Sequence, residues 1–296
     1  MTQHSADDTK ATTVPDSRPS LAEVRRISHE MRIDILRMLH AAGSGHPGGS
    51  LSVVDLIVVL FFRHLDRSLQ NVADPNRHRF VLSKGHGVPA LYAVLARLGI
   101  IPHAELMKLR TLGSPLQGHP VNSILPCVEA STGSLGQGVS IAQGMAMAAR
   151  LDKNDARVYA IIGDGEIQEG QVWETLMSAP KFGLDNFTVI LDYNKGQIDG
   201  PTAEVMDIDP IEDKLRSFRW DVQRIDGHDI EAIDAALDNT RTRGGRPHFI
   251  VADTVKGKGV SFMEGRIDWH GRTPDESQTL EAVREIESLL SGLDAQ

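Results

Sequence analysis

The stretch Val158-Tyr-Ala-Ile-Ile-Gly-Asp-Gly-Glu166 decides the fold. Its first five residues are apolar and rich in β-branched side chains, which predicts a short buried strand closed by a glycine. A helical pattern follows at 168–182, and a second apolar run at 187–193 predicts a neighbouring parallel strand that ends just before Asn194. Because open α/β sheets bind ligands at the carboxyl ends of their strands, we expect Asp164 and Asn194 to share one ligand-binding edge.

The rest of the chain continues this alternation of strands and helices. Three further strands are predicted, at 80–82, 220–225 and 248–253. Helices are predicted at 20–42, 51–62, 89–99, 136–151, 230–241 and 274–290, with long loops at 112–133 and 254–273. Such alternation implies an α/β fold, a doubly wound and mostly parallel sheet with helices on both faces. The polar residues 1–19 are expected to form a disordered tail, which leaves 20–296 as one domain.

Composition excludes several classes of function. A net charge of −9 argues against nucleic acid or an anionic membrane as the main partner. The single cysteine, Cys127, excludes an internal disulfide and suits a reducing compartment. The apolar segment 51–62 is too short to span a bilayer, and no secretory signal is evident at the N-terminus. We therefore expect a cytoplasmic protein.

The shared edge has the chemistry of a metal–diphosphate site. Asp164, Asn194 and a backbone carbonyl just past Asn194 offer oxygen ligands to a hard cation such as Mg²⁺ or Ca²⁺, and diphosphate oxygens would complete the shell. The N–H of Gly165 and the helix start behind it would face the phosphates. A lone GDG is also common as plain turn chemistry. The strand that ends in Asn194 at this spacing strengthens the ligand interpretation.

Four histidines lie in glycine-flanked loops: His46 in GHPGG, His86 in KGHG, His119 in QGHP and His270 in WHG. Each alone is an ordinary loop histidine, and no two have the spacing of zinc ligands. Their loops follow strands or precede helices, which is consistent with one rim of the sheet. Imidazoles converging there would donate to diphosphate oxygens and to substrate hydroxyls.

These motifs, taken together, resemble the transketolases. SGHPG, SKGHG, QGHP, TGSLGQG, GDGE, YN and KGKG…WHG occur in that family's order between about residues 20 and 275. The resemblance implies bound thiamine diphosphate and a Mg²⁺ or Ca²⁺ ion held by Asp164, Asn194 and the carbonyl of Gly196. It implies catalytic roles for His46, His119, His270 and Glu169. It implies cofactor contacts from His86, His270, Gly133, Ser134, Leu135, Gly163, Gly165, Glu166 and Asn194, with Leu135 as an apolar neighbour of the thiamine ring.

Two glutamates near the start of the helix at 168–182 match family residues that extend from the cofactor towards the subunit interface. They are Glu169 and Glu174. The alternative is that carboxylates in the first turns of a helix only stabilise its dipole.

The resemblance is to the N-terminal, diphosphate-binding subunit of a split, two-gene transketolase. It implies transfer of a two-carbon ketol unit from a ketose phosphate to an aldose phosphate, as in the pentose phosphate pathway. A C-terminal transketolase subunit would supply the pyrimidine domain, and two copies of each chain would form the active assembly. The alternatives are another thiamine-dependent ketol transferase with a specialised sugar substrate, and a non-catalytic module that binds thiamine diphosphate.

Overall fold

The computed structural model describes residues 18–65, 71–242 and 244–294. Its centre is a five-stranded sheet of order β1-β2-β3-β7-β6, and every neighbouring pair of strands is parallel. The strands are β1 (Arg79–Leu82), β2 (Val158–Gly163), β3 (Phe187–Tyr193), β6 (Asp221–Asp226) and β7 (His248–Asp253). The predicted α/β architecture is confirmed, and the five predicted strands lie within one residue of their expected positions.

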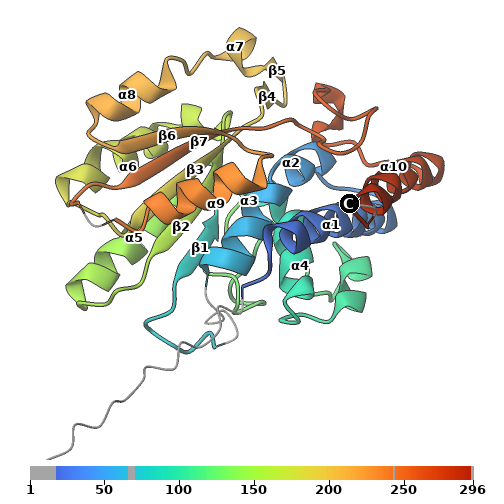
Figure 1. Cartoon of the computed structure of the whole chain (residues 1–296), viewed down its shortest axis with the longest axis horizontal. Coiled ribbons are helices and arrows are strands. Elements are labelled where there is room, and N and C mark those ends of the chain that lie inside the picture. Colours follow the sequence, from blue (N-terminus) through green and yellow to red (C-terminus); the bar gives the residue numbers. More distant parts are fainter. Residues whose placement is uncertain (1–17, 66–70, 243, 295–296) are drawn as a thin grey trace, which may run out of the picture.

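Helices cover both faces of the sheet (Figure 1). On one face lie α1 (Leu21–Ala42), α3 (Val54–Val59), α4 (Val88–Arg97) and α9 (Ile230–Asn239), with α10 (Glu276–Asp294) packed on α1. On the other lie α5 (Gln137–Leu151), α6 (Gly170–Lys181) and α8 (Ile211–Ser217). The sheet is therefore the middle layer of three.

The strand side chains alternate between two hydrophobic cores. Tyr159 and Ile161 of β2 pack with the first group of helices, whereas Val158, Ala160 and Ile162 pack with the second. All five are at most 1% exposed. Burial on both faces explains why this strand is an unbroken apolar run rather than a polar–apolar alternation.

The first helix begins where its sequence predicts. The Ser20 hydroxyl accepts a hydrogen bond from the Glu23 N–H at 3.2 Å, and the Glu23 carboxylate accepts one from the Ser20 N–H at 2.7 Å. This capping box satisfies donors that the first turn leaves unpaired. The helix ends at Gly43, whose φ of 62° is the left-handed conformation that glycine adopts without strain.

The predicted single helix at 51–62 is wrong in detail. Pro47 begins a helix inside the GHPGG loop, because its fixed φ suits the first helical position. The segment then divides into α2 (Pro47–Ser52), α3 and a π-helical turn at Leu60–His64. Between 195 and 217, where we predicted no elements, lie the short strands β4 (Gly196–Gln197) and β5 (Gly200–Pro201) and the helices α7 (Thr202–Val205) and α8.

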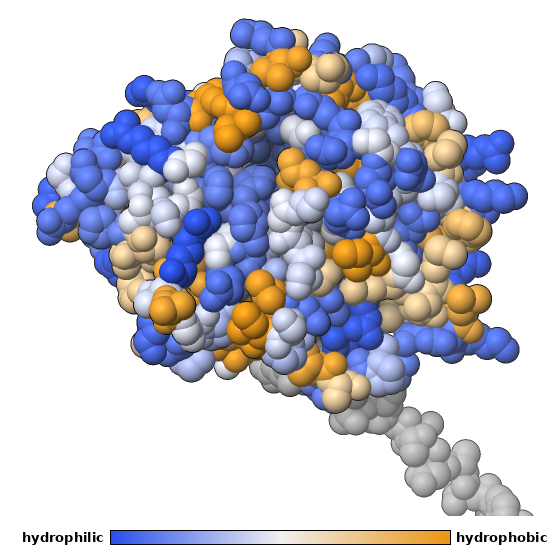
Figure 2. Space-filling model, turned by 180° about the vertical axis from the view of Figure 1, so that it is seen from behind, coloured by the Kyte–Doolittle hydropathy of each residue, from blue (hydrophilic) through white to orange (hydrophobic). Residues whose placement is uncertain are grey.

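The predicted tail lies almost entirely outside the described residues, since 1–17 are not described. Across 18–65, 71–242 and 244–294 no helix is long and apolar enough to cross a membrane. Seen from behind, the apolar side chains form separate patches with hydrophilic surface between them (Figure 2).

Candidate cofactor site

A cavity of about 340 Å³ lies at the carboxyl ends of β2 and β3, the edge that the sequence indicated. It is bounded by loops that are far apart in the chain, so the fold assembles the site from separate motifs. Most of the predicted site residues line it: His46, His86, Gly133, Leu135, Gly163, Asp164, Gly165, Glu166, Glu169, Asn194, Gly196 and His270. His119 and Ser134 are not among the lining residues.

Asp164 carries an oxygen without a partner. Its side chain is 2% exposed, and Oδ1 accepts a hydrogen bond from the Gly165 N–H at 2.9 Å. Oδ2 is buried and has no hydrogen-bond partner among the residues that the structure describes. Burial, and then the nearby Asp192 carboxylate, raise the pKa of Asp164 to about 6. A buried carboxylate oxygen in this state fits a cation that would bind to it.

Asn194 presents its oxygen in a fixed orientation. Its Nδ2 donates to Asp192 Oδ2 at 3.2 Å, and its Oδ1 accepts from the Gly196 N–H at 3.2 Å. Gly196 leaves no room for a side chain, since an added Cβ would lie 2.5 Å from Ile267 Cδ1 and 2.8 Å from Lys256 Cε. Among the described residues, no three His, Cys, Asp or Glu side chains form a metal-binding group by themselves. The predicted ligand set of two side chains, one carbonyl and diphosphate oxygens therefore fits this geometry and remains a prediction.

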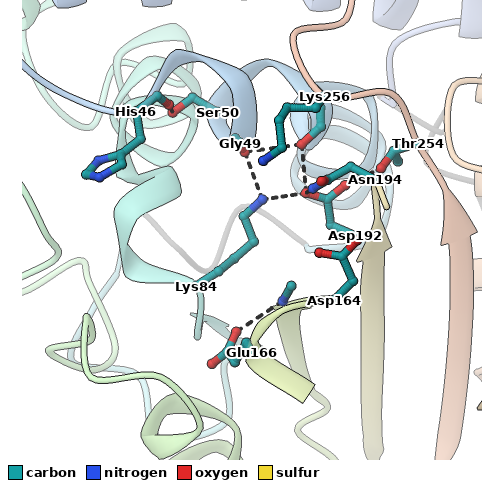
Figure 3. Close-up of polar contacts among 12 residues, drawn as sticks. His46, Gly49, Ser50, Lys84, Asp164, Glu166, Asp192, Asn194, Thr254 and Lys256 are labelled. Atoms are coloured by element: carbon teal, nitrogen blue, oxygen red, sulfur yellow. Dashed lines mark hydrogen bonds and ion pairs between the residues drawn. The ribbon is translucent and has the colours of Figure 1, made fainter. Parts of the chain in front are cut away.

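Two lysines that no sequence pattern singled out, Lys84 and Lys256, also line the cavity. Lys84 is 1% exposed, forms a close ion pair with Asp192 and donates to the Gly49 carbonyl at 2.8 Å (Figure 3). Burial would raise the pKa of Asp192, but the Lys84 charge and hydrogen bonds from Lys84, Thr254 and Ser52 hold it below its ordinary value. Asp192 thus stays ionised and neutralises Lys84.

Lys256 has no such partner. It is 2% exposed, and within the described part of the chain its ammonium makes no ion pair. Its Nζ lies 3.4 Å from Nδ1 of His270. Burial, and then the charge of Lys84, lower the pKa of Lys256 to about 8. The Asp164 and Asp192 carboxylates oppose these effects and raise the pKa, but neither forms a direct ion pair with the ammonium in the described part of the chain. The cavity therefore holds a buried cation without a direct ion-pair partner, which fits a phosphate ligand.

Three of the four predicted histidines form one cluster. The ring centroids of His46, His86 and His270 lie 5.3, 5.4 and 5.6 Å apart in the three pairs. Burial is the main cause that lowers their pKa values, to about 4 for His46 and His270 and well below the ordinary value for His86. All three are therefore neutral at physiological pH, and each offers one donor and one acceptor.

His119 lies at the margin of this cluster. Its ring centroid is 6.3 Å from that of His46, and the pKa of His119 is lowered by burial and by Arg110. An added Cβ on Gly133 would lie 2.9 Å from the His119 ring, so this glycine lets the two loops meet. Gly133 also has a φ of 148°, which disfavours other residues.

Glu166 lines the cavity, but its carboxylate is occupied by the protein. It accepts hydrogen bonds from the Ser83 hydroxyl, from the Gly136 N–H at 3.0 Å and from the Gly163 N–H at 3.1 Å. Ser83 directly follows β1 and Gly136 directly precedes α5, whereas Gly163 is the last residue of β2, three residues before Glu166. Its geometry is thus that of a brace between loops, and the predicted direct contact with the cofactor stays a prediction.

Glu169 and Glu174 both have exposed side chains. Glu169 lies immediately before α6 and lines the cavity, whereas Glu174 lies within the helix and does not. The position of Glu169 agrees with the expected path from the cavity towards the surface.

Comparisons with known proteins identify the family of this chain. The family model of the transketolase, thiamine diphosphate binding domain matches residues 24–287. The 6-deoxy-6-sulfo-D-fructose transketolase subunit SqwG of Clostridium sp. (strain MSTE9) is 44% identical over 83% of this chain and 89% of its own length. An apulose-4-phosphate transketolase subunit of Phocaeicola vulgatus is 38% identical over 90% of this chain and 95% of its own length.

Solved structures give the same result. Transketolase from Campylobacter jejuni superimposes with a TM-score of 0.80 at 30% identity, and covers 92% of this chain and 48% of that one. This chain therefore spans about half the length of that enzyme, but most of the length of the SqwG and Phocaeicola vulgatus proteins. The matches confirm the predicted fold and the resemblance on which the site was based. The chain belongs to the transketolase family and contains its thiamine diphosphate-binding domain.

Proposed function

We propose that this chain is the thiamine diphosphate-binding subunit of a two-subunit transketolase. Two similar proteins that are matched over most of their length are named as transketolase subunits. The observation that carries the proposal is that one cavity holds both a buried Asp164 oxygen without a hydrogen-bond partner and a Lys256 ammonium without an ion pair, among the described residues. The two charges attract each other across the cavity but form no direct pair. A metal–diphosphate ligand would give each of them a close partner of opposite charge.

The residues of this chain would bind the diphosphate end of the cofactor. Asp164, Asn194 and the Gly196 carbonyl would hold Mg²⁺ or Ca²⁺. Lys256 would contact the diphosphate oxygens, as would the Gly165 N–H, which in this structure donates to Asp164 Oδ1 at 2.9 Å. Leu135, which is half-buried at the cavity wall, would pack on the thiamine ring. When bound, thiamine diphosphate supplies the nucleophilic carbon that attacks a ketose carbonyl.

The histidine cluster would bind the sugar. A neutral imidazole accepts a proton from a hydroxyl or donates its own N–H to an oxygen, so His46, His270 and His119 can orient hydroxyls and move protons. The buried Nδ1 of His46 has no hydrogen-bond partner among the described residues. Glu169 would extend this polar path from the cavity towards a neighbouring subunit.

The partner subunit would supply the pyrimidine domain and close the cavity against water. We propose two copies of each chain in the active assembly, with residues 20–296 of this chain acting as one domain. The free and half-buried Cys127 supports a reducing, cytoplasmic location. The substrates are proposed to be a ketose and an aldose, phosphorylated as in the pentose phosphate pathway.

A specialised sugar is the second candidate for the substrate. The two similar proteins are named for 6-deoxy-6-sulfo-D-fructose and for apulose-4-phosphate, so this family accepts more than one ketose. The present chain would then belong to a dedicated catabolic enzyme with the same two-carbon transfer.

The test is reconstitution. The chain is co-expressed with a candidate C-terminal transketolase chain, and the mixture is assayed against a panel of ketoses and aldoses with thiamine diphosphate and Mg²⁺. Turnover by the mixture, and not by either chain alone, is expected. Turnover by this chain alone would contradict the two-subunit proposal. Cofactor binding without turnover on any sugar would favour a non-catalytic module.

A further inference from the structure

Asp55 is a buried charge that the proposed mechanism does not use. It lies on α3, where every other residue is apolar and buried, and is 5% exposed. It does not line the cofactor cavity. Burial would raise the pKa of Asp55, but the Arg32 charge and a hydrogen bond from His228 outweigh burial and hold the pKa well below its ordinary value. A charge kept ionised inside an apolar helix face calls for an explanation.

Arg32 forms the first arm that leaves this carboxylate. Its guanidinium donates to Asp55 through Nη1 at 3.1 Å and Nη2 at 2.6 Å, the two-pronged geometry that fixes a guanidinium plane. Its remaining Nε donates to the backbone carbonyl of Lys258 at 3.1 Å. Arg32 is 3% exposed, so this chain of contacts is buried.

His228 forms the second arm. Its Nε2 accepts a hydrogen bond from the Val255 N–H at 2.9 Å, so this nitrogen carries no proton. The proton therefore lies on Nδ1, which donates to Asp55 Oδ2 at 2.7 Å. Only this tautomer satisfies both contacts, and the carboxylate of Asp55 selects it.

Both arms end on the backbone of one short segment. Val255 is the residue before Lys256, and Lys258 is two residues after it, so the segment is held on both sides of the lysine that enters the cavity. The same segment is tied elsewhere by the Gly257 N–H, which donates to the Gly48 carbonyl at 3.0 Å. Gly257 itself has a φ of 77°. The Gly265 N–H also donates to the Lys256 carbonyl at 2.9 Å. The two arms therefore add side-chain contacts on both sides of Lys256 to these backbone hydrogen bonds.

We propose that Asp55, with Arg32 and His228, is a positioning unit that fixes residues 255–258 and thereby aims the Lys256 ammonium at the diphosphate. It rests on the proposed function, because the diphosphate is its target. Asp55 acts at a distance, through two hydrogen-bonded side chains and a backbone. It touches neither the cofactor nor the substrate.

The chain offers a matched control. His64 is another buried histidine bound to a carboxylate, with its Nε2 2.8 Å from Asp234 Oδ1, and neither residue lines the cavity. We expect His64→Ala and His228→Ala to lower the unfolding temperature by similar amounts. His64→Ala should leave Lys256 in place.

The experiment measures thiamine diphosphate binding with Mg²⁺ by calorimetry, in the complex of this chain with its partner subunit. We expect His228→Ala to weaken thiamine diphosphate binding about tenfold, because the charge-assisted contact between Lys256 and the diphosphate is partly lost. His228→Gln keeps one donor and one acceptor, and should restore affinity to within about threefold of wild type. His64→Ala should bind as wild type does. In a Lys256→Met background, His228→Ala should have no further effect.

A second measurement needs no cofactor. Amide hydrogen exchange of a peptide that spans 255–260 should accelerate at least tenfold in His228→Ala and remain unchanged in His64→Ala. An unchanged rate in His228→Ala would overturn the positioning unit, as would an undiminished loss of affinity in the Lys256→Met background. If wild type itself failed to bind thiamine diphosphate, the proposed function would fall, while the exchange rates would still decide whether Asp55 and its arms fix the segment.

Discussion

Lys256→Met should stabilise the cofactor-free protein and weaken the affinity of the assembled enzyme for thiamine diphosphate. Lys256 is 2% exposed and has a pKa of about 8, below its usual 10.5, because the cavity buries its ammonium next to Lys84. This difference corresponds to about 3 kcal/mol by which the empty cavity disfavours the charged form. Methionine has a similar length and fills the space without a charge.

The sign of the stability effect depends on pH. At pH 7 Lys256 remains protonated, since the pH is below its folded pKa of about 8. The penalty on the folded state is therefore fully present there and disappears as the pH rises above the unfolded pKa. Lys256→Met should raise the unfolding free energy by up to about 3 kcal/mol at pH 7, and by much less near pH 10.5.

The effect on cofactor affinity has the opposite sign. A contact between an ammonium and a phosphate is worth about 1.5–3 kcal/mol, which corresponds to about 10–150-fold in the dissociation constant. Denaturant unfolding of the free chain measures the first effect, and calorimetric titration of the assembled enzyme with thiamine diphosphate and Mg²⁺ measures the second.

Lys258→Met is the matched control. This substitution removes the same charge from the same loop, but the Lys258 side chain is 35% exposed and pairs with Glu264 at 3.3 Å. It should change neither quantity appreciably. Equal losses of affinity in the two variants, or wild-type affinity in Lys256→Met, would refute the assignment of Lys256 to the diphosphate.

The remaining predictions concern the metal, the sugar and the assembly. Asp164→Asn should abolish Mg²⁺-dependent cofactor binding and leave the circular dichroism spectrum unchanged. Asn194→Ala should weaken cofactor binding less, because no charge is lost. Wild-type affinity in Asp164→Asn would disprove the metal site. His46→Ala and His119→Ala should reduce kcat/KM for the ketose at least tenfold with little change in cofactor affinity. His270→Ala should instead weaken the binding of the cofactor. Unaltered kinetics in all three variants would mean that these are ordinary loop histidines. Light scattering should show a larger assembly only when both subunits are mixed, and turnover should appear only in that sample.

Sequence patterns located the sheet and the rim well because their causes are local. The runs that end at Gly163 and Tyr193 are mostly apolar and are buried on both faces, so each strand can be predicted from its own residues. Parallel pairing then brings Asp164 and Asn194 together without any knowledge of distant contacts. The capping box at Ser20 is equally local.

What the sequence did not reveal depends on contacts between distant segments. Lys84 and Lys256 lie in the SKGHG and KGKG loops, yet a lysine in a glycine-rich loop normally points to water. Only the fold shows that Asp192, on a third segment, makes burial of Lys84 possible. Likewise, Glu166 follows the GDG motif, but two of its three donors, the Ser83 hydroxyl and the Gly136 N–H, come from distant segments that only the folded chain brings together. A lysine directly flanked by glycine after a predicted strand is the one signal that could have found both cations.

The carboxylate of Asp192 has a consequence for protein engineering. It is 0% exposed and binds Lys84, Ser52, Thr254 and Asn194, which come from four separate parts of the chain. A redesign for thermostability that replaced Asp192 with leucine would leave the Lys84 ammonium buried and alone, at a cost of several kcal/mol. Asp192 and the four residues that it binds can therefore be exchanged, or transferred to another scaffold, only as a complete set. A library that aims at new sugars should hold them constant and vary the cavity wall instead.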